Sequence, residues 1–98
     1  MKTSGLPEMT PFKVGETVKV LQVTGEAGAK VPEHYSTMEA VIIVQEGDAQ
    51  LEINDEKHLL HAGTVFIIPA GKNHTLTLKS RFKAMVIMSK VSEVKFVE

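Results

Sequence analysis

The chain has 98 residues, and its 11 Lys and Arg against 12 Asp and Glu give a formal net charge of −1. This length fits one domain, and the balanced charge excludes the basic stripe on which nucleic-acid binding depends. With 43% hydrophobic residues and no cysteine, the composition is that of a globular protein without disulfides, thiolate nucleophiles or cysteine-based metal centres.

Residues 1–16 precede the first clear strand pattern. Gly5, Pro7 and Pro11 exclude a helix there, which predicts an extended N-terminal arm. The arm is either a loose tail or a segment that pairs with a sheet edge. In the second case, the sheet edge belongs to a neighbouring or swapped copy of the chain. Its apolar side chains are available for such docking: Leu6, Met9 and Phe12.

Residues 17–98 are a series of short β signals and are predicted to form a single domain. The predicted strands cover residues 17–24, 31–35, 40–46, 49–53, 57–60, 65–68, 74–78 and 82–88, with 91–97 as a further candidate. Turns rich in Gly, Pro, Asn and Asp separate them, and Pro32 excludes a central ladder position for its own segment. No segment has a helical period, so the pattern predicts an all-β sandwich or barrel.

The histidines are the residues best suited to chemistry. His34 ends one predicted strand and is followed closely by Ser36, whereas His74 begins another strand. In a barrel, two such strand ends face one cavity, where imidazoles ligate a metal or hold a polar ligand. His58 and His61 flank two leucines close to a polar hairpin and are expected to be surface or edge residues.

Two segments carry Gly, Pro and His at fixed spacings. The first has Gly28, five residues and His34, and later Ala40, six residues and Gly47; the second has Gly63, Pro69, Gly71 and His74 in the pattern G-x5-P-x-G-x2-H. This arrangement resembles the two motifs of the small single-domain cupins over about residues 17–90. The resemblance implies a jelly-roll barrel, the double-stranded β-helix, which agrees with the strand pattern.

The chain departs from the metal-binding pattern of that family. Ser36 stands where the cupins place a second histidine, and Ala40 stands at the glutamate position. Only His34 and His74 remain of the three-His, one-Glu set, so no metal cofactor is favoured. If a divalent metal binds, His34 and His74 need a further ligand such as Glu39, although strand alternation points Glu39 away from the face that carries Ala40.

The predicted inward face is mostly apolar with three polar groups at the cavity mouth. It comprises His34, Ser36, Met38, Ala40, Ile42 and Val44 on one side and His74, Leu76 and Leu78 on the other. Of these, His34, Ser36 and His74 are the predicted ligand-binding residues. The alternative is a barrel filled by its own side chains, for which Met85 and Met88 are candidates.

Three functions therefore remain open. The first is a small-molecule-binding or sensor barrel without a metal, and the second is a metal-dependent cupin enzyme of the oxygenase or isomerase type. The second would use His34, His74 and a non-standard third ligand. The third is an interaction protein whose N-terminal arm adds to a neighbour's sheet. The resemblance also implies a homodimer, because small cupins commonly dimerise through their sheets.

The longest apolar runs, residues 40–44 and 84–88, are far shorter than the roughly 18 residues that a membrane-spanning helix needs. No apolar segment follows Lys2, so a secretory signal is not expected. We therefore expect a cytoplasmic protein without a membrane partner.

Overall fold

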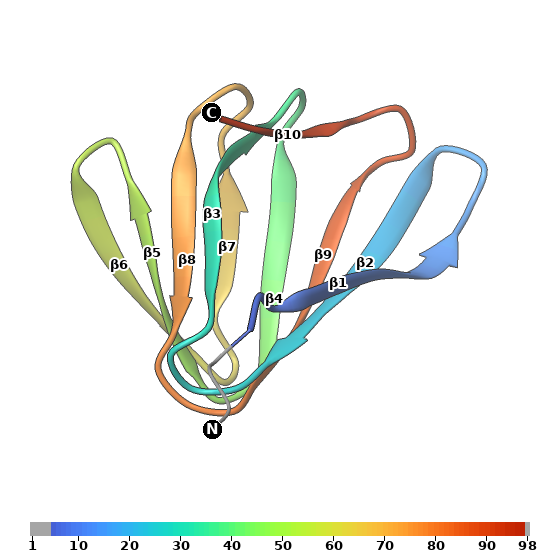
Figure 1. The fold of residues 1–98 in the computed structure, drawn as a ribbon. Helices are drawn as coiled ribbons and strands as arrows, with labels where there is room; N and C mark the ends of the chain where they lie inside the picture. The colour runs from blue at the N-terminus through green and yellow to red at the C-terminus, as the bar shows by residue number, and fades with distance from the viewer. Residues whose placement is uncertain (1–4, 98) are drawn as a thin grey trace.

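The computed structural model describes residues 5–97, which form two five-stranded antiparallel sheets facing each other as a jelly-roll barrel (Figure 1). The strands are β1 (Glu8–Val14), β2 (Val18–Gly25), β3 (Lys30–Ser36), β4 (Ala40–Glu46), β5 (Asp48–Ile53), β6 (Glu56–His61), β7 (Val65–Ile68), β8 (His74–Leu78), β9 (Phe82–Ser89) and β10 (Val94–Phe96). The first sheet has the order β1-β2-β9-β4-β7 and the second β10-β3-β8-β5-β6. The predicted all-β fold is confirmed. Within residues 5–97, no helix is long and apolar enough to cross a membrane.

The core lies between the two sheets and follows the alternation of the strands. In β9, Phe82, Ala84, Val86 and Met88 are buried, and the residues between them are more exposed. In β8, the residues buried by the same alternation start with His74. Because the side-chain period of a strand is two residues, the polar group at the start of β8 is held on the same face as the apolar core.

The turns have the backbone geometry that their residues favour. Asn54 and Asp55, between β5 and β6, have φ of 54° and 64°. Two consecutive positive φ values define the type I′ turn, whose twist matches that of a two-residue β-hairpin. Gly47, between β4 and β5, has φ of 86°, as expected for the predicted Glu46–Asp48 turn.

Pro32 lies in β3, which is an interior strand with β10 on one side and β8 on the other. The β3–β8 register shifts between Val31 and His34, so Pro32 falls within an irregularity of the ladder. A bulge of this kind accommodates a residue without an N–H donor. The expectation that Pro32 keeps its segment out of a central ladder position is therefore wrong, because β3 has a neighbour on each side and the proline interrupts the ladder only locally.

The N-terminal segment joins the first sheet within its own chain. β1 pairs with β2 from Glu8 opposite Thr24 to Val14 opposite Lys19, with a register shift between Pro11 and Lys13. β1 is therefore an edge strand, and the sheet begins at residue 8 rather than near residue 17. Residues 1–4 of the predicted arm lie outside the described residues.

The prediction that Met38 faces inward is wrong. β3 ends at Ser36 and β4 begins at Ala40, so Met38 lies in the intervening turn and is 43% exposed. The inward register expected for Ser36 and Ala40 is correct, because both are buried. The alternation fails at Met38 because it was extended through a turn, where side chains no longer alternate between two faces.

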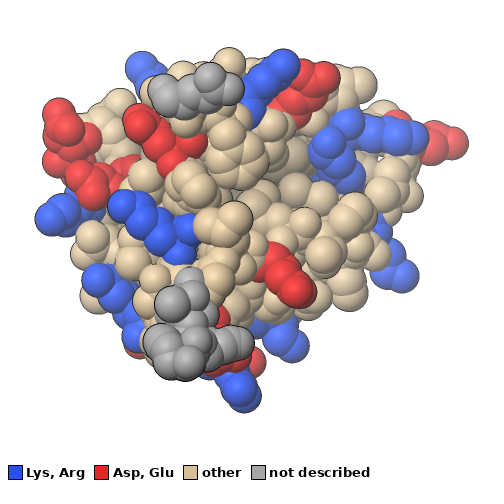
Figure 2. All heavy atoms as spheres, in the orientation of Figure 1, with Lys and Arg blue, Asp and Glu red and all other residues tan. Residues whose placement is uncertain are grey.

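Both signs of charge are present on the face shown in Figure 2, where Lys and Arg side chains are interspersed with Asp and Glu around the outline. This face therefore carries no continuous basic stripe.

Candidate functional site

The two motif histidines lie together at one end of the barrel. His34 in β3 is the direct ladder partner of His74 in β8, and their ring centroids are 4.2 Å apart with an interplanar angle of 58°. Both side chains are buried. The prediction that these histidines occupy adjacent inward-facing strands is confirmed.

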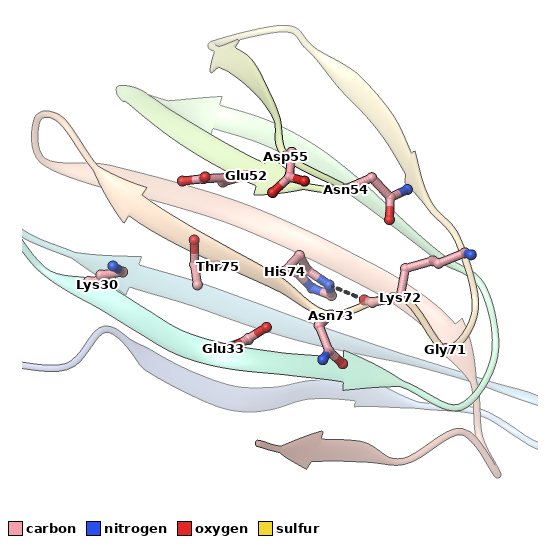
Figure 3. Close-up of a pocket in the computed structure, with 10 residues that line it drawn as sticks. All are labelled: Lys30, Glu33, Glu52, Asn54, Asp55, Gly71, Lys72, Asn73, His74 and Thr75. Atoms are coloured by element: carbon pink, nitrogen blue, oxygen red, sulfur yellow. Dashed lines mark hydrogen bonds between the residues drawn. The ribbon is translucent and has the colours of Figure 1, made fainter. Parts of the chain in front are cut away.

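A backbone carbonyl fixes the orientation of each imidazole. Nδ1 of His34 donates to the carbonyl oxygen of Pro32 at 2.7 Å, and Nδ1 of His74 donates to that of Lys72 at 2.9 Å, the bond drawn in Figure 3. A carbonyl oxygen only accepts hydrogen bonds, so each Nδ1 must carry a proton. In the neutral rings, both Nε2 atoms are consequently unprotonated acceptors.

The neutral form is favoured in both rings. Burial lowers the pKa of His34 below its usual value of 6.5, against a smaller upward effect of the Pro32 hydrogen bond. Burial also lowers the pKa of His74, with the Lys72 hydrogen bond opposing and the neighbouring His34 adding to the decrease. A buried ring that has no carboxylate partner loses hydration when it becomes charged, which is the physical cause of both shifts.

A small cavity of about 40 Å³ lies next to the histidine pair. Its polar lining consists of the three predicted ligand-binding side chains, His34, Ser36 and His74. The remaining described lining residues are apolar: Met9, Val23, Val31, Ala40, Ile42, Leu51, Ile68, Leu76, Val86, Met88 and Val94. The barrel is therefore largely filled, and Met88 contributes as expected, whereas Met85 is not among the lining residues.

The closure of this end by β10 was not predicted in detail from the sequence. β10 lies across the end of the barrel in Figure 1, and it pairs with β3 from Val94 opposite Ser36 to Phe96 opposite His34. The Phe96 ring centroid is 5.3 Å from that of His34. The pattern of residues 91–97 predicts a strand. A strand that pairs over only three residues gives no indication in the sequence of which other strand it pairs with.

Ser92 is a structural residue that the sequence analysis missed. It is 1% exposed, and its hydroxyl accepts a hydrogen bond from the Met38 backbone N–H at 3.2 Å. Its own backbone oxygen accepts a bond from Lys19 Nζ at 2.8 Å. The first bond ties the loop before β10 to the turn between β3 and β4, and the second ties the same loop to β2.

A second, polar hollow of about 520 Å³ lies near the start of β8 (Figure 3). It is lined by Lys30, Glu33, Glu52, Asn54, Asp55, Gly71, Lys72, Asn73, His74 and Thr75. Of the predicted site residues, only His74 contributes to it, so the polar hollow is distinct from the cavity that contains His34 and Ser36.

The other two histidines are not part of the histidine pair. His58 packs its ring 4.9 Å from that of Phe66 and lies 3.5 Å from a carboxylate oxygen of Glu56, and His61 is exposed. This placement agrees with the expectation that His58 and His61 are edge or surface residues.

The side chains at the barrel end do not fit the four-ligand metal set of the family. Ser36 and Ala40 line the cavity at the positions of the missing ligands, and Glu39 is exposed in the turn before β4. Across residues 5–97, no three side chains among His, Cys, Asp and Glu are grouped to hold a metal ion. The pair of imidazoles is the only part of that set that the chain provides here.

A jelly-roll barrel with a buried histidine pair at one end is the architecture expected of a cupin. Residues 21–89 match the Cupin_2 family model, a cupin domain, and the chain therefore belongs to the cupins. No functionally curated protein is significantly similar to it.

Solved structures agree with the family assignment. A cupin-2 domain protein from Shewanella frigidimarina has a TM-score of 0.74 at 25% identity, covering 85% of this chain and 80% of that one. A cupin superfamily protein from Desulfitobacterium hafniense has a TM-score of 0.78 at 23% identity, covering 85% and 76%. A salicylate 1,2-dioxygenase from Pseudaminobacter salicylatoxidans has a TM-score of 0.71 at 18% identity, covering 81% of this chain and 25% of that enzyme. The last two establish similarity of fold alone.

The histidine pair predicts a pH dependence of stability. Because both folded-state pKa values lie below 6.5, the unfolded chain takes up protons first as the pH falls. Stability should be constant above about pH 7.5 and decrease through pH 6.5 towards 5.5, by up to about 1.4 kcal/mol per pH unit for each ring. Urea unfolding of the wild type and of His34→Gln/His74→Gln between pH 5.5 and 7.5 measures this slope. An equal slope in the two proteins would contradict the prediction.

Proposed function

We propose that the protein is a cupin that binds a small molecule at the histidine end of its barrel without the usual metal. The observation that supports this function is the pairing of two buried, neutral imidazoles with Ser36 in a cavity whose other described lining residues are apolar. A few convergent polar groups in an apolar cavity orient a ligand and give it specificity.

Binding requires the cavity to enlarge, because 40 Å³ accommodates only a few atoms. Met9 and Met88 both line the cavity. Methionine has three rotatable bonds and adapts to irregular space at small cost, so these two side chains are the ones expected to move.

A metal-dependent enzyme of the oxygenase or isomerase type is the second candidate, and one observation favours it. Histidines that bind metals commonly donate their other ring nitrogen to a carbonyl, as His34 and His74 do here. Such an enzyme would need a non-standard third ligand, for which Glu39 would have to leave its exposed position.

Metal analysis combined with a ligand screen distinguishes these two functions. We expect the dialysed protein to hold less than about 0.1 equivalents of metal per chain. We also expect the screen to yield small molecules that raise the melting temperature of the wild type but not that of His34→Ala. His61→Ala, at an exposed histidine, is the matched control and should keep ligand binding. Near one equivalent of Fe, Mn, Ni, Cu or Zn, lost in His34→Ala but retained in His61→Ala, would establish the enzyme candidate instead.

We also propose a two-fold homodimer to which the N-terminal region contributes through β1. β1 is an edge strand, and it exposes Phe12 at 50% and Val14 at 60%. Unpaired backbone groups and apolar side chains along one edge favour pairing with a second copy, and a stable contact needs roughly 1,000 Å² of buried surface.

Sedimentation at micromolar concentration tests the dimer. The wild type should sediment at about twice the monomer mass of 10.7 kDa. Phe12→Lys/Val14→Lys should weaken association at least about tenfold, because charged side chains at an edge oppose pairing. The control, Val65→Lys/Ile67→Lys on β7, places the same charges at the opposite edge of the same sheet and should remain dimeric. A wild-type mass near 10.7 kDa would rule out the dimer.

A further inference from the structure

Each imidazole of the histidine pair has one nitrogen left for a ligand, and in both rings it is Nε2. The Nδ1–H groups are occupied by the carbonyl oxygens of Pro32 and Lys72. Burial lowers the pKa of both rings and so favours their neutral form, in which the two Nε2 atoms accept hydrogen bonds and cannot donate. A ligand group bound by this pair must therefore bring its own proton.

An apolar groove adjoins the cavity that contains the pair. The groove has a volume of about 540 Å³ and shares Met9, Val31 and Val94 with the cavity. Its other lining residues include Leu6, Leu21 and Phe96. The shared residues form the boundary between the cavity and the groove. A ligand with its polar group at the pair therefore reaches the groove when the Met9 side chain moves aside.

Charged ligand groups are disfavoured at both places. No Lys, Arg, Asp or Glu is among the described residues that line the cavity or the groove. A carboxylate or phosphate would meet two acceptors and no cation there, and an ammonium group would lose its hydration without a carboxylate partner.

We propose that the site takes an uncharged hydroxyl compound with an apolar body, either a phenol or an aliphatic alcohol. Its hydroxyl donates its one proton to Nε2 of His34, the ring that lies beside Phe96, and its apolar body lies in the groove beside Met9, Val94 and Phe96. This inference rests on the proposed small-molecule function and adds the chemical class of the ligand.

Probes of similar shape test the hydrogen-bonding requirement. The aromatic set is 4-ethylphenol, its methyl ether 4-ethylanisole, and 4-ethylbenzoate; the aliphatic set is 1-hexanol, methyl pentyl ether and hexanoate. Titration of the metal-free protein at pH 7.5, followed by amide NMR shifts, gives the dissociation constants. We expect a hydroxyl probe to bind at least about tenfold more tightly than its ether, because the hydroxyl donates a hydrogen bond to Nε2 of His34 and the ether has no proton to donate. The carboxylates should bind more weakly still.

His34→Phe removes the Nε2 acceptor but keeps an aromatic ring at the same position, so it distinguishes the effect of the hydrogen bond from the effect of the shape of the site. It should reduce the affinity of the hydroxyl probe towards that of the ether while leaving the ether affinity nearly unchanged, and the retained ether binding shows that the variant is folded. His61→Phe, at an exposed histidine outside the cavity, is the matched control and should change neither affinity. The two probe sets distinguish phenols from aliphatic alcohols.

The outcomes separate this inference from the proposed function. Equal binding of hydroxyl and ether probes, or tighter binding of a carboxylate, would overturn the inference and leave the proposed function standing. If no probe binds at millimolar concentration but the wider screen yields ligands lost in His34→Ala, the ligand class is wrong and the small-molecule function stands. If neither the probes nor the screen yields a ligand, both proposals fail.

Discussion

Gly47→Ala is expected to lower the free energy of unfolding by about 3 kcal/mol or more, because two penalties coincide at this turn. The φ of 86° disfavours any residue with a Cβ. A Cβ built at Gly47 also overlaps the carbonyl oxygen of Arg81 and lies 2.9 Å from its carbonyl carbon and 3.0 Å from Ser80 Oγ. The obstacle is backbone, which cannot rotate away as a flexible side chain can. Movement there also disturbs the 2.9 Å bond from the Asp48 N–H to Ser80 Oγ.

Gly63→Ala is the matched control for this prediction. Its φ of 94° is similar, but a Cβ there meets nothing within 4 Å. The free energy of unfolding of the control should therefore fall only by the cost of placing a Cβ at a positive φ, which is about 1 kcal/mol. Urea unfolding of both variants measures the difference, and equal losses would show that the contact with Arg81 is relieved by small shifts.

The Gly47 site illustrates which parts of the fold could be predicted from the sequence. The turn and its positive φ follow from Glu46-Gly47-Asp48 alone, since glycine is the residue that tolerates this conformation. The close approach of Arg81 does not follow, because it joins residues 34 positions apart. Strands and turns depend on local alternation and turn chemistry, whereas contacts between strands depend on register, which local pattern specifies weakly in short strands.

The candidate site also has features that could be predicted from the sequence and features that could not. The pairing of His34 with His74 could be predicted because both stand at motif spacings and at strand ends that face inward. The two Nδ1–carbonyl bonds could not, because each depends on the backbone path two residues before the ring. Met38 was misplaced because a turn ended the alternation, and the role of Ser92 depends on a hydrogen bond to Met38, which lies 54 positions away in the chain.

Ser36→His combined with Ala40→Glu is expected to convert the barrel end into a metal site. Both positions line the cavity with His34 and His74, so the double variant brings three imidazoles and one carboxylate to one place. Four such ligands bind divalent transition metals strongly, and we expect one equivalent of Co²⁺ with a dissociation constant of about 1 µM or lower, at least about 1,000-fold tighter than in the wild type. Cobalt absorption bands during titration and metal analysis after dialysis measure the gain.

Space limits this conversion, because the cavity is small and Ala40 lies opposite Met88 in the β4–β9 ladder. A second form of the variant therefore adds Met88→Ala to make room for the glutamate. The matched control replaces Ala40→Glu by Val41→Glu, which moves the same carboxylate by one residue to the other face of β4. Binding by the Ala40→Glu form and not by the Val41→Glu form would mean that the carboxylate must stand at position 40, where the natural chain has alanine. No gain in either form of the Ala40→Glu variant would mean that the His34–His74 pair is not oriented to share a metal ion with positions 36 and 40.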